Sequence, residues 1–257
     1  MESKKRIVAM IPARMGSSRF PGKPLVKILD LPMIEHVRRR ALLSCVDDVY
    51  VATCDEEIFT TVVQYGGKSI MTAKTHERCT DRVEEAVQNL QADIIVILQG
   101  DEPLFMPEVI NLLIEPMSEN QKIFCTNLLS PILHERDIID EDIVKAVIDC
   151  KQYLMYYSRA PIPYRRVKDA STFYRQTGIS AFTKEFLQTY SHLPPTQKEV
   201  IESIDFLRIL DHRYPIFGVI YNQRTVGVDR EDDIKIVEEI LQEDPLQNML
   251  YKKILEI

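Results

Sequence analysis

The loop that follows the first hydrophobic run of the chain is rich in basic residues. Its cationic and hydroxyl side chains, between positions 12 and 24, are Arg14, Ser17, Ser18, Arg19 and Lys23. Arginine presents a planar fork of donors and lysine a point charge, so both suit the oxygens of a polyphosphate. The spacing matches neither a Walker A loop nor GxGxxG, which disfavours an ordinary ATPase or a dinucleotide-binding protein. The loop therefore predicts a phosphate-binding cradle, with a solvated basic loop as the alternative.

An acidic site follows the most hydrophobic segment, residues 94–98. Gln99, Gly100, Asp101 and Glu102 come directly after it. Ligands of open α/β sheets bind beyond the carboxyl ends of strands, and Mg²⁺ prefers oxygen ligands beside substrate phosphates. Asp101 is therefore the first candidate ligand for Mg²⁺. The alternative is a simple turn at Gly100-Asp101 followed by a solvated Glu102.

A second candidate metal ligand lies near the C-terminal end of the chain. Asp229 follows Val226-Gly227-Val228 and precedes an amphipathic segment. An aspartate there can bind Mg²⁺, but it can also cap the following helix, with Asp232 near the third helical position. The local sequence favours the cap, although one residue can serve both purposes.

The segments between these sites alternate between strand-like runs and amphipathic stretches, which is typical of an α/β protein with a largely parallel sheet. Strands are expected at 5–11, 46–53, 69–71, 94–98, 123–129, 144–148, 173–182 and 215–221. Helices are expected at 32–44, 55–65, 80–90, 107–116, 184–191, 200–210 and 230–242, with Asp55 as an N-cap. In the absence of a repeat or linker, we predict one domain over 1–257, in which about 130–180 forms a smaller β-rich lobe.

Composition excludes several classes of protein. The 257 residues carry 32 Lys+Arg against 39 Asp+Glu, a net charge of −7, which disfavours a general nucleic-acid binder. No apolar run approaches the ~20 residues of a membrane span, and the N-terminus lacks a signal-peptide core, so we expect a cytoplasmic protein. The five cysteines and five histidines are scattered, which indicates neither a disulfide framework nor a zinc site.

Four motifs, taken together, give the chain a resemblance to a known family. They are IPARMGSSRFPGKPL (11–25), LQGDEP (98–103), YYSRAPIPY (156–164) and VGVDREDD (226–233). In this order and at these separations they resemble the cytidylyltransferases that activate 3-deoxy-manno-octulosonate (Kdo), the CMP-Kdo synthetases. The likeness runs from about residue 6 to 242. It implies a three-layer, Rossmann-like nucleotide-diphospho-sugar transferase fold, with a mostly parallel mixed sheet and a small β-rich dimerisation lobe.

The resemblance also implies a role for each matching residue. The residues implied to bind CTP are Ala13, Arg14, Ser17, Arg19, Lys23, Gln99 and Asp101, of which Arg14, Lys23 and Asp101 would be catalytic. Mg²⁺ would be the cofactor, held by Asp101 and Asp229. The residues implied to bind the acidic sugar are Tyr157, Arg159, Gln176, Glu202 and Arg208. From the residues alone, Arg159 could instead pack on Tyr164, and Arg208 could form a surface ion pair with Asp205 or Asp211.

Three segments depart from the family pattern. Gln176 stands where the family has a sugar-contacting His, Arg78-Cys79 replaces Ser-Gly, and Phe206 replaces Gln. We expect these losses to cluster on the sugar side, because the triphosphate and metal motifs are intact. The acceptor is therefore expected to be Kdo or a close relative of it.

Two other functions compete with this interpretation. One is a CMP-activating enzyme for a different acidic sugar, such as a nonulosonate or an amino-octulosonate. The other is a non-catalytic nucleotide-binding protein, which loses support because Lys23 and Asp101 are both present. The expected partners are CTP and an acidic 2-keto-3-deoxy sugar, with no nucleic acid and no membrane. A homodimer through residues 131–163 is also implied, although the tyrosines at 153, 156 and 157 could equally serve core packing.

Overall fold

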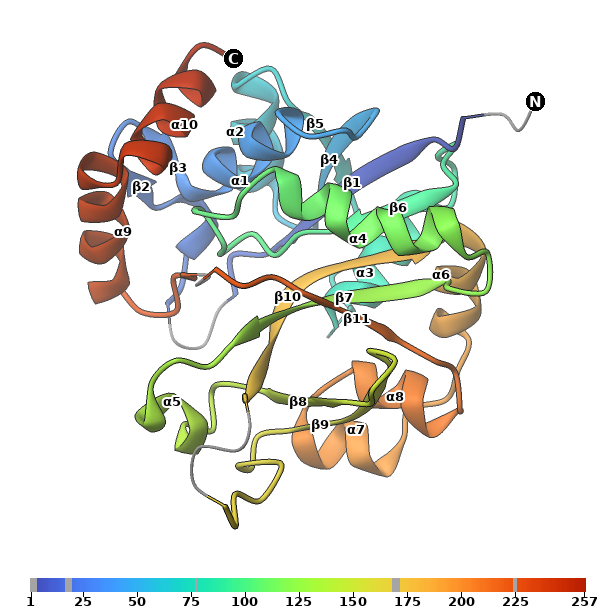
Figure 1. Ribbon diagram of the computed structural model, residues 1–257. Helices are drawn as coiled ribbons and strands as arrows, with labels where there is room; N and C mark the ends of the chain where they lie inside the picture. The colour runs from blue at the N-terminus through green and yellow to red at the C-terminus, as the bar shows by residue number, and fades with distance from the viewer. Residues whose placement is uncertain (1–3, 17–19, 77, 168–171, 224–225) are drawn as a thin grey trace. The chain divides into compact units, whose positions relative to one another are not determined.

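The computed structural model describes residues 4–16, 20–76, 78–167, 172–223 and 226–257 (Figure 1). The chain forms two compact units, the first made of Met1–Asn111 and Thr225–Ile257 and the second of Leu112–Arg224. The β-rich lobe expected at about 130–180 falls within the second unit. The single domain over 1–257 stays a prediction.

The first unit contains a four-stranded parallel sheet in the order β6, β1, β4, β5. These strands are Ile94–Ile97, Ile7–Ala13, Asp48–Thr53 and Lys68–Met71. Every residue of β1 and β6 is buried, as expected where parallel strands are covered on both faces and the sequence is a continuous aliphatic run. The expected α/β architecture with a parallel sheet is confirmed, and the loops that follow β1 and β6 carry the predicted site residues.

Helices and two short strands complete the first unit. They are η1 (Lys23–Leu25), β2 (Lys27–Ile28), β3 (Leu31–Pro32), α1 (Met33–Leu42), α2 (Glu56–Gln64), α3 (Cys79–Val87), α9 (Asp232–Glu243) and α10 (Pro245–Leu255). Helix α4 (Glu108–Glu119) begins in this unit and continues past its boundary. The C-terminal helices join the N-terminal loop in one buried cluster, which includes Ile28, Met33, Val228, Leu241 and Ile254. This cluster anchors the segment that precedes α9, and that segment carries Asp229.

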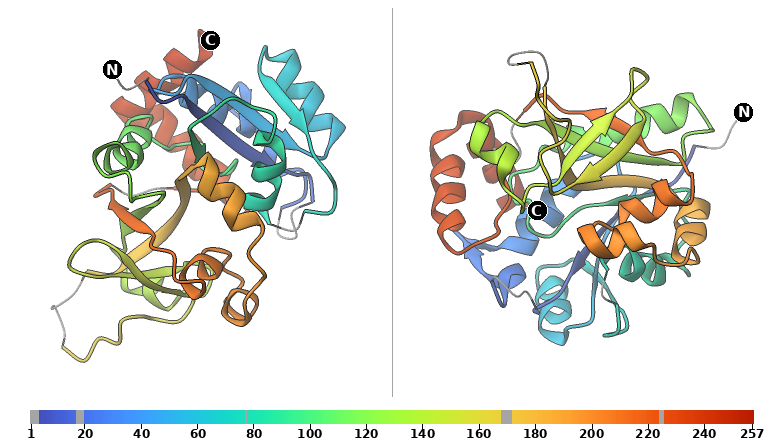
Figure 2. Two further views of the ribbon diagram at one scale, coloured as in Figure 1. Left: turned by 90° about the vertical axis from the view of Figure 1, so that its right-hand side faces the viewer. Right: turned by 90° about the horizontal axis from the view of Figure 1, so that it is seen from below.

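The second unit is mainly antiparallel. Its strands are β7 (Cys125–Pro131), β8 (Lys145–Ile148), β9 (Leu154–Ser158), β10 (Tyr174–Thr183) and β11 (Phe217–Ile220). Strand β10 pairs antiparallel with β7 and β8, β8 pairs antiparallel with β9, and β11 pairs parallel with β7. The helices are α5 (Glu135–Ile139), α6 (Lys184–Ser191), α7 (Gln197–Glu202) and α8 (Phe206–Asp211). Figure 2 shows β8 and β9 side by side from two further directions.

The local expectations differ from the structure at three places. The helix expected at 200–210 is two helices, because Ser203 adopts the left-handed backbone conformation (φ 53°) and ends α7. Asp55 is the N-cap residue of α2, as expected, but its side chain forms no capping hydrogen bond; its carboxylate accepts a hydrogen bond from the Met15 N–H instead. Strand β9 and helices α5 and α10 are not among the expected elements, although Leu246, Leu250 and Ile254 of α10 recur at a helical spacing.

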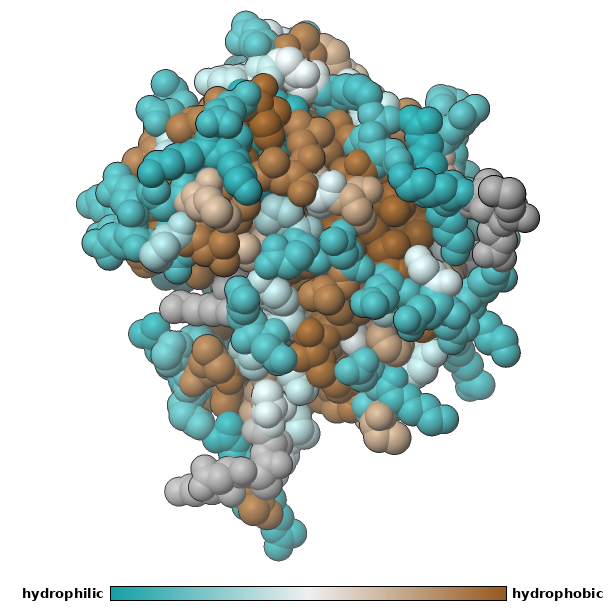
Figure 3. Space-filling model, turned by 45° about the horizontal axis from the view of Figure 1, so that its top comes forward, coloured by the Kyte–Doolittle hydropathy of each residue, from teal (hydrophilic) through white to brown (hydrophobic). Residues whose placement is uncertain are grey.

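No helix in the part of the chain that the structure describes is long and apolar enough to cross a membrane. Figure 3 shows hydrophilic side chains over much of one face, with apolar patches between them. In the first unit, Ile236, Leu246 and Met249 of the C-terminal helices are each more than 40% exposed. Single exposed apolar side chains of this kind are ordinary on protein surfaces.

Candidate active site

A cavity of about 320 Å³ lies in the first unit, beyond the carboxyl ends of β1 and β6. The predicted residues that line it are Ala13, Arg14, Lys23, Gln99, Asp101 and Asp229. A cavity of this size is within the range of small-molecule sites. The structure thus brings six of the predicted nucleotide- and metal-binding residues to one cavity. Ser17 and Arg19, also predicted to bind CTP, lie outside the described residues.

The basic loop is held in place by backbone and carboxylate contacts. The Gly22 N–H donates to the Met15 carbonyl (3.0 Å), and the Asp55 carboxylate accepts the Met15 N–H (2.8 Å). Gly22 has φ 77°, a conformation that costs glycine little, and this turn leads directly into η1, where Lys23 stands. The loop therefore presents Lys23 from a fixed turn, while Arg14 remains exposed at the end of β1.

Lys23 lies between the two predicted metal ligands. Its ammonium nitrogen is 2.6 Å from Asp101 Oδ2 and 3.9 Å from Asp229 Oδ1, and it donates to the Val228 carbonyl at 2.8 Å. The Lys23 side chain is only 12% exposed, whereas those of Asp101 and Asp229 are 33% and 57% exposed. The two carboxylates therefore share one cation and keep oxygen surface open to a ligand.

A backbone contact brings the two acidic segments together. The Val228 N–H donates to the Asp101 carbonyl at 2.9 Å. A Cβ at Gly227 would lie 3.4 Å from that carbonyl, an ordinary van der Waals distance. The backbone hydrogen bond therefore holds the segment that carries Asp229 beside Asp101.

Two of the local alternatives for these acidic residues are wrong. Asp229 is not the N-cap of α9, which begins at Asp232; the Asp233 carboxylate instead accepts the N–H groups of Asp229 and Arg230. Glu102 is not a solvated charge, because it is only 6% exposed. The N-cap position of α9 belongs to Glu231.

The donor set fits Mg²⁺ of the substrate-bound kind. The described residues contain no group of three or more His, Cys, Asp or Glu side chains that could hold a metal ion. Mg²⁺ does not need such a cage, because it is commonly bound by one or two carboxylates together with substrate phosphates and waters. Asp101 and Asp229, which already share the Lys23 ammonium, offer two carboxylates of this kind.

The cavity is also lined by residues that the sequence analysis did not place there, among them His76, Arg78, Cys79 and Arg82. The Gln99 amide donates to the Cys79 sulfur at 3.3 Å, which joins the predicted residue to this wall. The departure Arg78-Cys79 was expected on the sugar side; the structure places it with the phosphate-loop residues instead. The signal was available, because the whole Arg78–Arg82 stretch corresponds to a motif of the family.

The predicted sugar-binding residues all lie in the second unit. Tyr157 is fully buried and its hydroxyl donates to Asn127 Oδ1 at 2.9 Å; burial raises its pKa well above the ordinary value. Gln176 lies at a register shift in the pairing of β10 with β7. Neither position tests the role that the resemblance implies for these residues, which stays a prediction.

The other three predicted sugar-binding residues are engaged with one another or with neighbours. The Glu202 carboxylate accepts from the Ser158 hydroxyl (2.6 Å) and the Arg159 N–H (2.9 Å), and the Arg159 guanidinium donates to the Glu202 carbonyl (2.8 Å). Arg208 makes a two-pronged pair with Glu199 at 2.6 and 2.8 Å. Arg208 is 5% exposed, so the alternative role, a surface ion pair with Asp205 or Asp211, is wrong.

None of the five cysteines, all within the described residues, forms a disulfide.

Comparison with known proteins identifies the family. Residues 8–225 match the family described as Cytidylyltransferase. The 3-deoxy-manno-octulosonate cytidylyltransferase of Syntrophobacter fumaroxidans is 41% identical over 245 residues, covering 93% of this chain and 98% of the relative. The enzyme of the same name from Geotalea uraniireducens is 37% identical over 249 residues, with 92% and 99% covered.

Solved structures agree. A structure of CMP:2-keto-3-deoxy-manno-octonic acid synthetase complexed with CTP superposes with a TM-score of 0.88 at 36% identity, covering 93% of this chain and 99% of the other. A cytidylyltransferase from Leptospira borgpetersenii, at 18% identity and a TM-score of 0.64, shares the fold. The expected nucleotidyltransferase fold is confirmed. This chain belongs to the cytidylyltransferase family of nucleotidyltransferases.

Proposed function

We propose that this protein activates a 2-keto-3-deoxy sugar acid, Kdo or a close relative, by converting CTP and the sugar to a CMP-sugar and pyrophosphate. The observation that carries the proposal is the Lys23 ammonium held between Asp101 and Asp229 at the mouth of the cavity. Nucleotide triphosphate chemistry needs a cation for the phosphates and carboxylates for a divalent metal at one place. The names of the relatives supply the sugar.

The reaction requires no protein nucleophile. The anomeric hydroxyl oxygen of the sugar would form a bond to the α-phosphorus of CTP, the bond from that phosphorus to the bridging oxygen of pyrophosphate would break, and the hydroxyl proton would pass to solvent. Positioning and charge neutralisation supply most of the rate in such transfers. Lys23 and Arg14 would stabilise the negative charge on the departing pyrophosphate, together with Ser17 and Arg19.

Asp101 and Asp229 are the residues that would hold Mg²⁺. When bound, this ion would polarise the phosphate oxygens and lower the pKa of the attacking hydroxyl. Lys23 would then leave the carboxylates for the phosphates, a transfer of one ion-pair partner that its flexible side chain permits.

The residues proposed to receive the sugar are Tyr157, Arg159, Gln176, Glu202 and Arg208. Arg159 supports this best, because its backbone and guanidinium are both fixed by Glu202 and a fixed arginine suits a carboxylate ligand. Tyr157 and Arg208 are buried, so they would act by holding the neighbouring polypeptide in place.

A second candidate acceptor is another acidic sugar, a nonulosonate or an amino-octulosonate. The observation that favours it is Gln176, which stands in place of a sugar-contacting His of the family pattern. An amide and an imidazole differ in shape and in hydrogen-bonding groups, so the substitution bears on the acceptor. A non-catalytic nucleotide-binding protein is disfavoured because Lys23, Asp101 and Asp229 meet in one cluster.

The proposed setting is the cytoplasm, where CTP is available, and the product would serve the synthesis of a cell-surface polysaccharide or lipopolysaccharide. A homodimer through residues 131–163 is part of the proposal. Leu133, Ile139 and Met155 lie within this segment and are 65%, 73% and 62% exposed, which favours an apolar contact with a second copy. Light scattering on Met155→Lys tests it: the expected result is a monomer where the unchanged protein is a dimer.

Pyrophosphate release tests the function. CTP, UTP, ATP and GTP would each be supplied with Mg²⁺ and with Kdo, an amino-octulosonate or a nonulosonate, beside a control without sugar. Release with CTP and Kdo alone is expected for a Kdo enzyme. Release with CTP and a different sugar would mean that the Gln176 departure selects the acceptor. CTP binding without release from any sugar would favour the non-catalytic alternative.

A further inference from the structure

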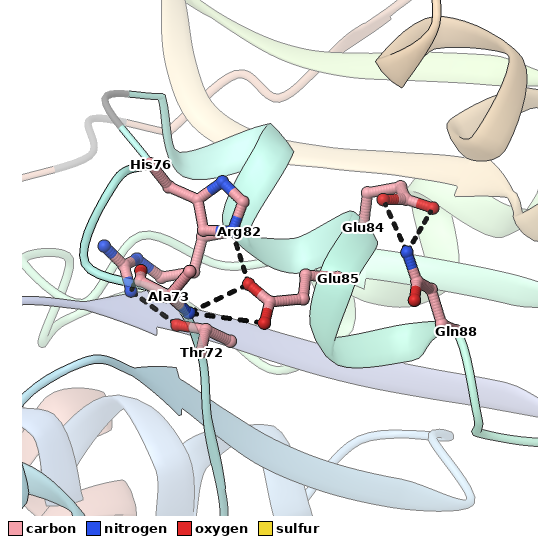
Figure 4. A network of polar contacts seen from close by, with 7 residues as sticks. All are labelled: Thr72, Ala73, His76, Arg82, Glu84, Glu85 and Gln88. Atoms are coloured by element: carbon pink, nitrogen blue, oxygen red, sulfur yellow. Dashed lines mark hydrogen bonds and ion pairs between the residues drawn. The ribbon is translucent and has the colours of Figure 1, made fainter.

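One wall of the cavity, lined by His76, Arg78, Cys79 and Arg82, has no assigned part in the proposed reaction. Arg82 lies on α3, and His76 lies between β5 and α3 in the chain. Figure 4 shows how a small network of polar contacts connects His76 and Arg82.

Glu85 lies at the centre of the network. Its carboxylate accepts a hydrogen bond from His76 Nε2, and its two oxygens accept the Ala73 N–H at 2.9 and 3.3 Å. Burial by itself raises the pKa of Glu85, but the hydrogen bonds from Ala73 and His76 outweigh it and leave the pKa below its ordinary value. Glu85 is therefore a charged acceptor that fixes the orientation of the His76 ring.

Arg82 fastens the same segment from another direction. Its guanidinium donates to the Thr72 hydroxyl at 2.5 Å and to the Ala73 carbonyl at 3.4 Å, and the residue is only 3% exposed. The N–H and the carbonyl of Ala73 are thus both engaged, one by Glu85 and the other by Arg82. The wall that carries His76 is consequently set before any ligand arrives.

His76 keeps one ring nitrogen for a ligand. Nε2 is bound to Glu85, and Nδ1 lies on the opposite side of the ring in Figure 4. The side chain is 21% exposed and lines the cavity. The phosphates of a nucleotide are matched by Lys23 and Arg14, so the neutral polar groups of the nucleoside remain for this wall.

We infer that His76 contacts the nucleoside part of the bound nucleotide through Nδ1, and that Glu85 is a positioning residue that acts through His76. The inference rests on the proposed function, because it takes the ligand of this cavity to be CTP. The group contacted is an edge of the base or a ribose hydroxyl, which share the same hydrogen-bonding chemistry.

Calorimetric binding of three probes tests the inference: CTP, CMP and inorganic tripolyphosphate. His76→Ala is expected to weaken CTP and CMP about tenfold, the value of one hydrogen bond to a ligand, and to leave tripolyphosphate unchanged. Glu85→Ala is expected to act in the same direction. The double variant is expected to bind no more weakly than His76→Ala, since residues that act through one another are not additive.

Glu84→Ala is the matched control. Glu84 is the neighbour of Glu85 on α3, but its carboxylate accepts from Gln88 instead of from His76 (Figure 4). The affinity of Glu84→Ala for all three probes is expected to equal that of the unchanged protein. A thermal unfolding curve is measured for every variant, so that loss of folded protein is not mistaken for loss of a contact.

Three outcomes are decisive. Equal loss for CTP and CMP without loss for tripolyphosphate supports a nucleoside contact. Loss for tripolyphosphate as well, or no loss at all, overturns the inference. If the unchanged protein binds no CTP, the proposed function fails. If the unchanged protein binds CTP and His76→Ala binds it equally well, only the inference about His76 fails.

Two further ligands separate the base from the ribose. If His76 contacts the base, His76→Ala is expected to narrow the preference for CTP over UTP. If it contacts the ribose, the variant is expected to lose the preference for CTP over 2′-deoxy-CTP. Each result supports a nucleoside contact and names its partner group.

Discussion

The two units of this protein use pairs of opposite charge in different ways. In the first unit, Lys23 meets Asp101 and Asp229 at a cavity, and both carboxylates are at least 33% exposed. In the second, Arg208 meets Glu199 inside the protein, where the two side chains are 6% and 2% exposed. The same kind of contact is therefore open to a ligand in one unit and closed in the other.

The difference lies in how many bonds each charge has already made. Glu199 gives both oxygens to the Arg208 guanidinium, which also lies 4.9 Å from the Tyr190 ring. Lys23 takes one oxygen of the Asp101 carboxylate and the Val228 carbonyl, so the second Asp101 oxygen is not engaged by Lys23. A buried, two-pronged pair serves the fold, whereas a half-exposed pair can serve a substrate.

The largest expected effect is on the open pair. Asp101→Asn should lower pyrophosphate release by about a thousandfold or more, because it removes a charged ligand of Mg²⁺ and the partner of Lys23. Thermal unfolding should change little. The control is Asp93→Asn, at the opposite end of β6, which should keep full turnover. If Asp101→Asn turned over as fast as the unchanged protein, the metal-ligand role of Asp101 would be contradicted.

The closed pair should respond in stability. Arg208→Met leaves the Glu199 carboxylate buried without its guanidinium, and breaking such a pair costs about 3–5 kcal/mol of unfolding free energy. Denaturant unfolding measures it. The double variant with Glu199→Met should recover much of the loss, because apolar replacements of a buried pair are often tolerated. If Arg208→Met were as stable as the unchanged protein, the pair with Glu199 would not stabilise the fold.

A buried histidine makes the first unit acid-sensitive. His36 is fully buried, its Nε2 bonds to the Ile28 carbonyl at 2.8 Å, and burial lowers its pKa from 6.5 to about 4. Between pH 6.5 and 4, His36 is therefore protonated in the unfolded chain but stays neutral in the folded chain. Stability is complete above pH 6.5 and falls as the pH drops toward 4.

The expected loss from His36 is about 2 kcal/mol between pH 7 and 5. Urea unfolding at the two pH values measures it. His36→Gln keeps an amide donor for the Ile28 carbonyl but does not titrate. Its free energy of unfolding should therefore fall by about 2 kcal/mol less between pH 7 and 5 than that of the unchanged protein. An equal fall in the two proteins would contradict the assignment to His36.

A smaller effect is expected on metal affinity. The Lys23 ammonium competes with a divalent ion for Asp101. Lys23→Met should therefore bind Mn²⁺ about tenfold more tightly in the absence of nucleotide, as a paired cation is worth roughly one pKa unit or more. Calorimetry with Mn²⁺ alone measures this. Lys27→Met, at an exposed position four residues on, should bind as the unchanged protein does; unchanged or weaker affinity in Lys23→Met would count against the competition.

The smallest effect is expected at the surface of the first unit. Asp48 forms ion pairs with Arg6 and with the Lys68 side chain, and the hydrogen bond from Lys68 is the main cause of its lowered pKa. Because Arg6 and Lys68 are both about half exposed, Asp48→Asn should cost no more than about 1 kcal/mol. The cost should shrink further in 0.5 M salt, and a salt-independent loss would indicate a buried pair.

Much of this protein could be predicted from sequence because the relevant signals are local. The aliphatic runs of β1 and β6 predicted buried parallel strands; Ala13 ends β1, Arg14 follows it, and Gln99 and Asp101 come within four residues of the end of β6. Chain continuity alone puts such residues at the strand ends. The four motifs together named the family.

Contacts between distant segments could not be predicted in the same way. The break at Ser203 depends on one residue in the left-handed conformation, and the partner of Arg208 is Glu199 on the preceding helix instead of an acid on its own. Asp205 and Asp211 each lie three residues from Arg208, so local spacing offers them as partners. The guanidinium instead reaches across the break at Ser203 to Glu199, a contact that no local spacing indicates.

The sequence by itself determined the buried strands, the basic loop, the acidic residues that follow β6, and the family. Only the tertiary structure decided that Lys23 and Asp229, 206 residues apart in the printed sequence, lie 3.9 Å from each other, and that His76 and Arg82 line the same cavity. Hydrophobic period and loop composition act over a few residues, whereas a site depends on which segments the core packs together.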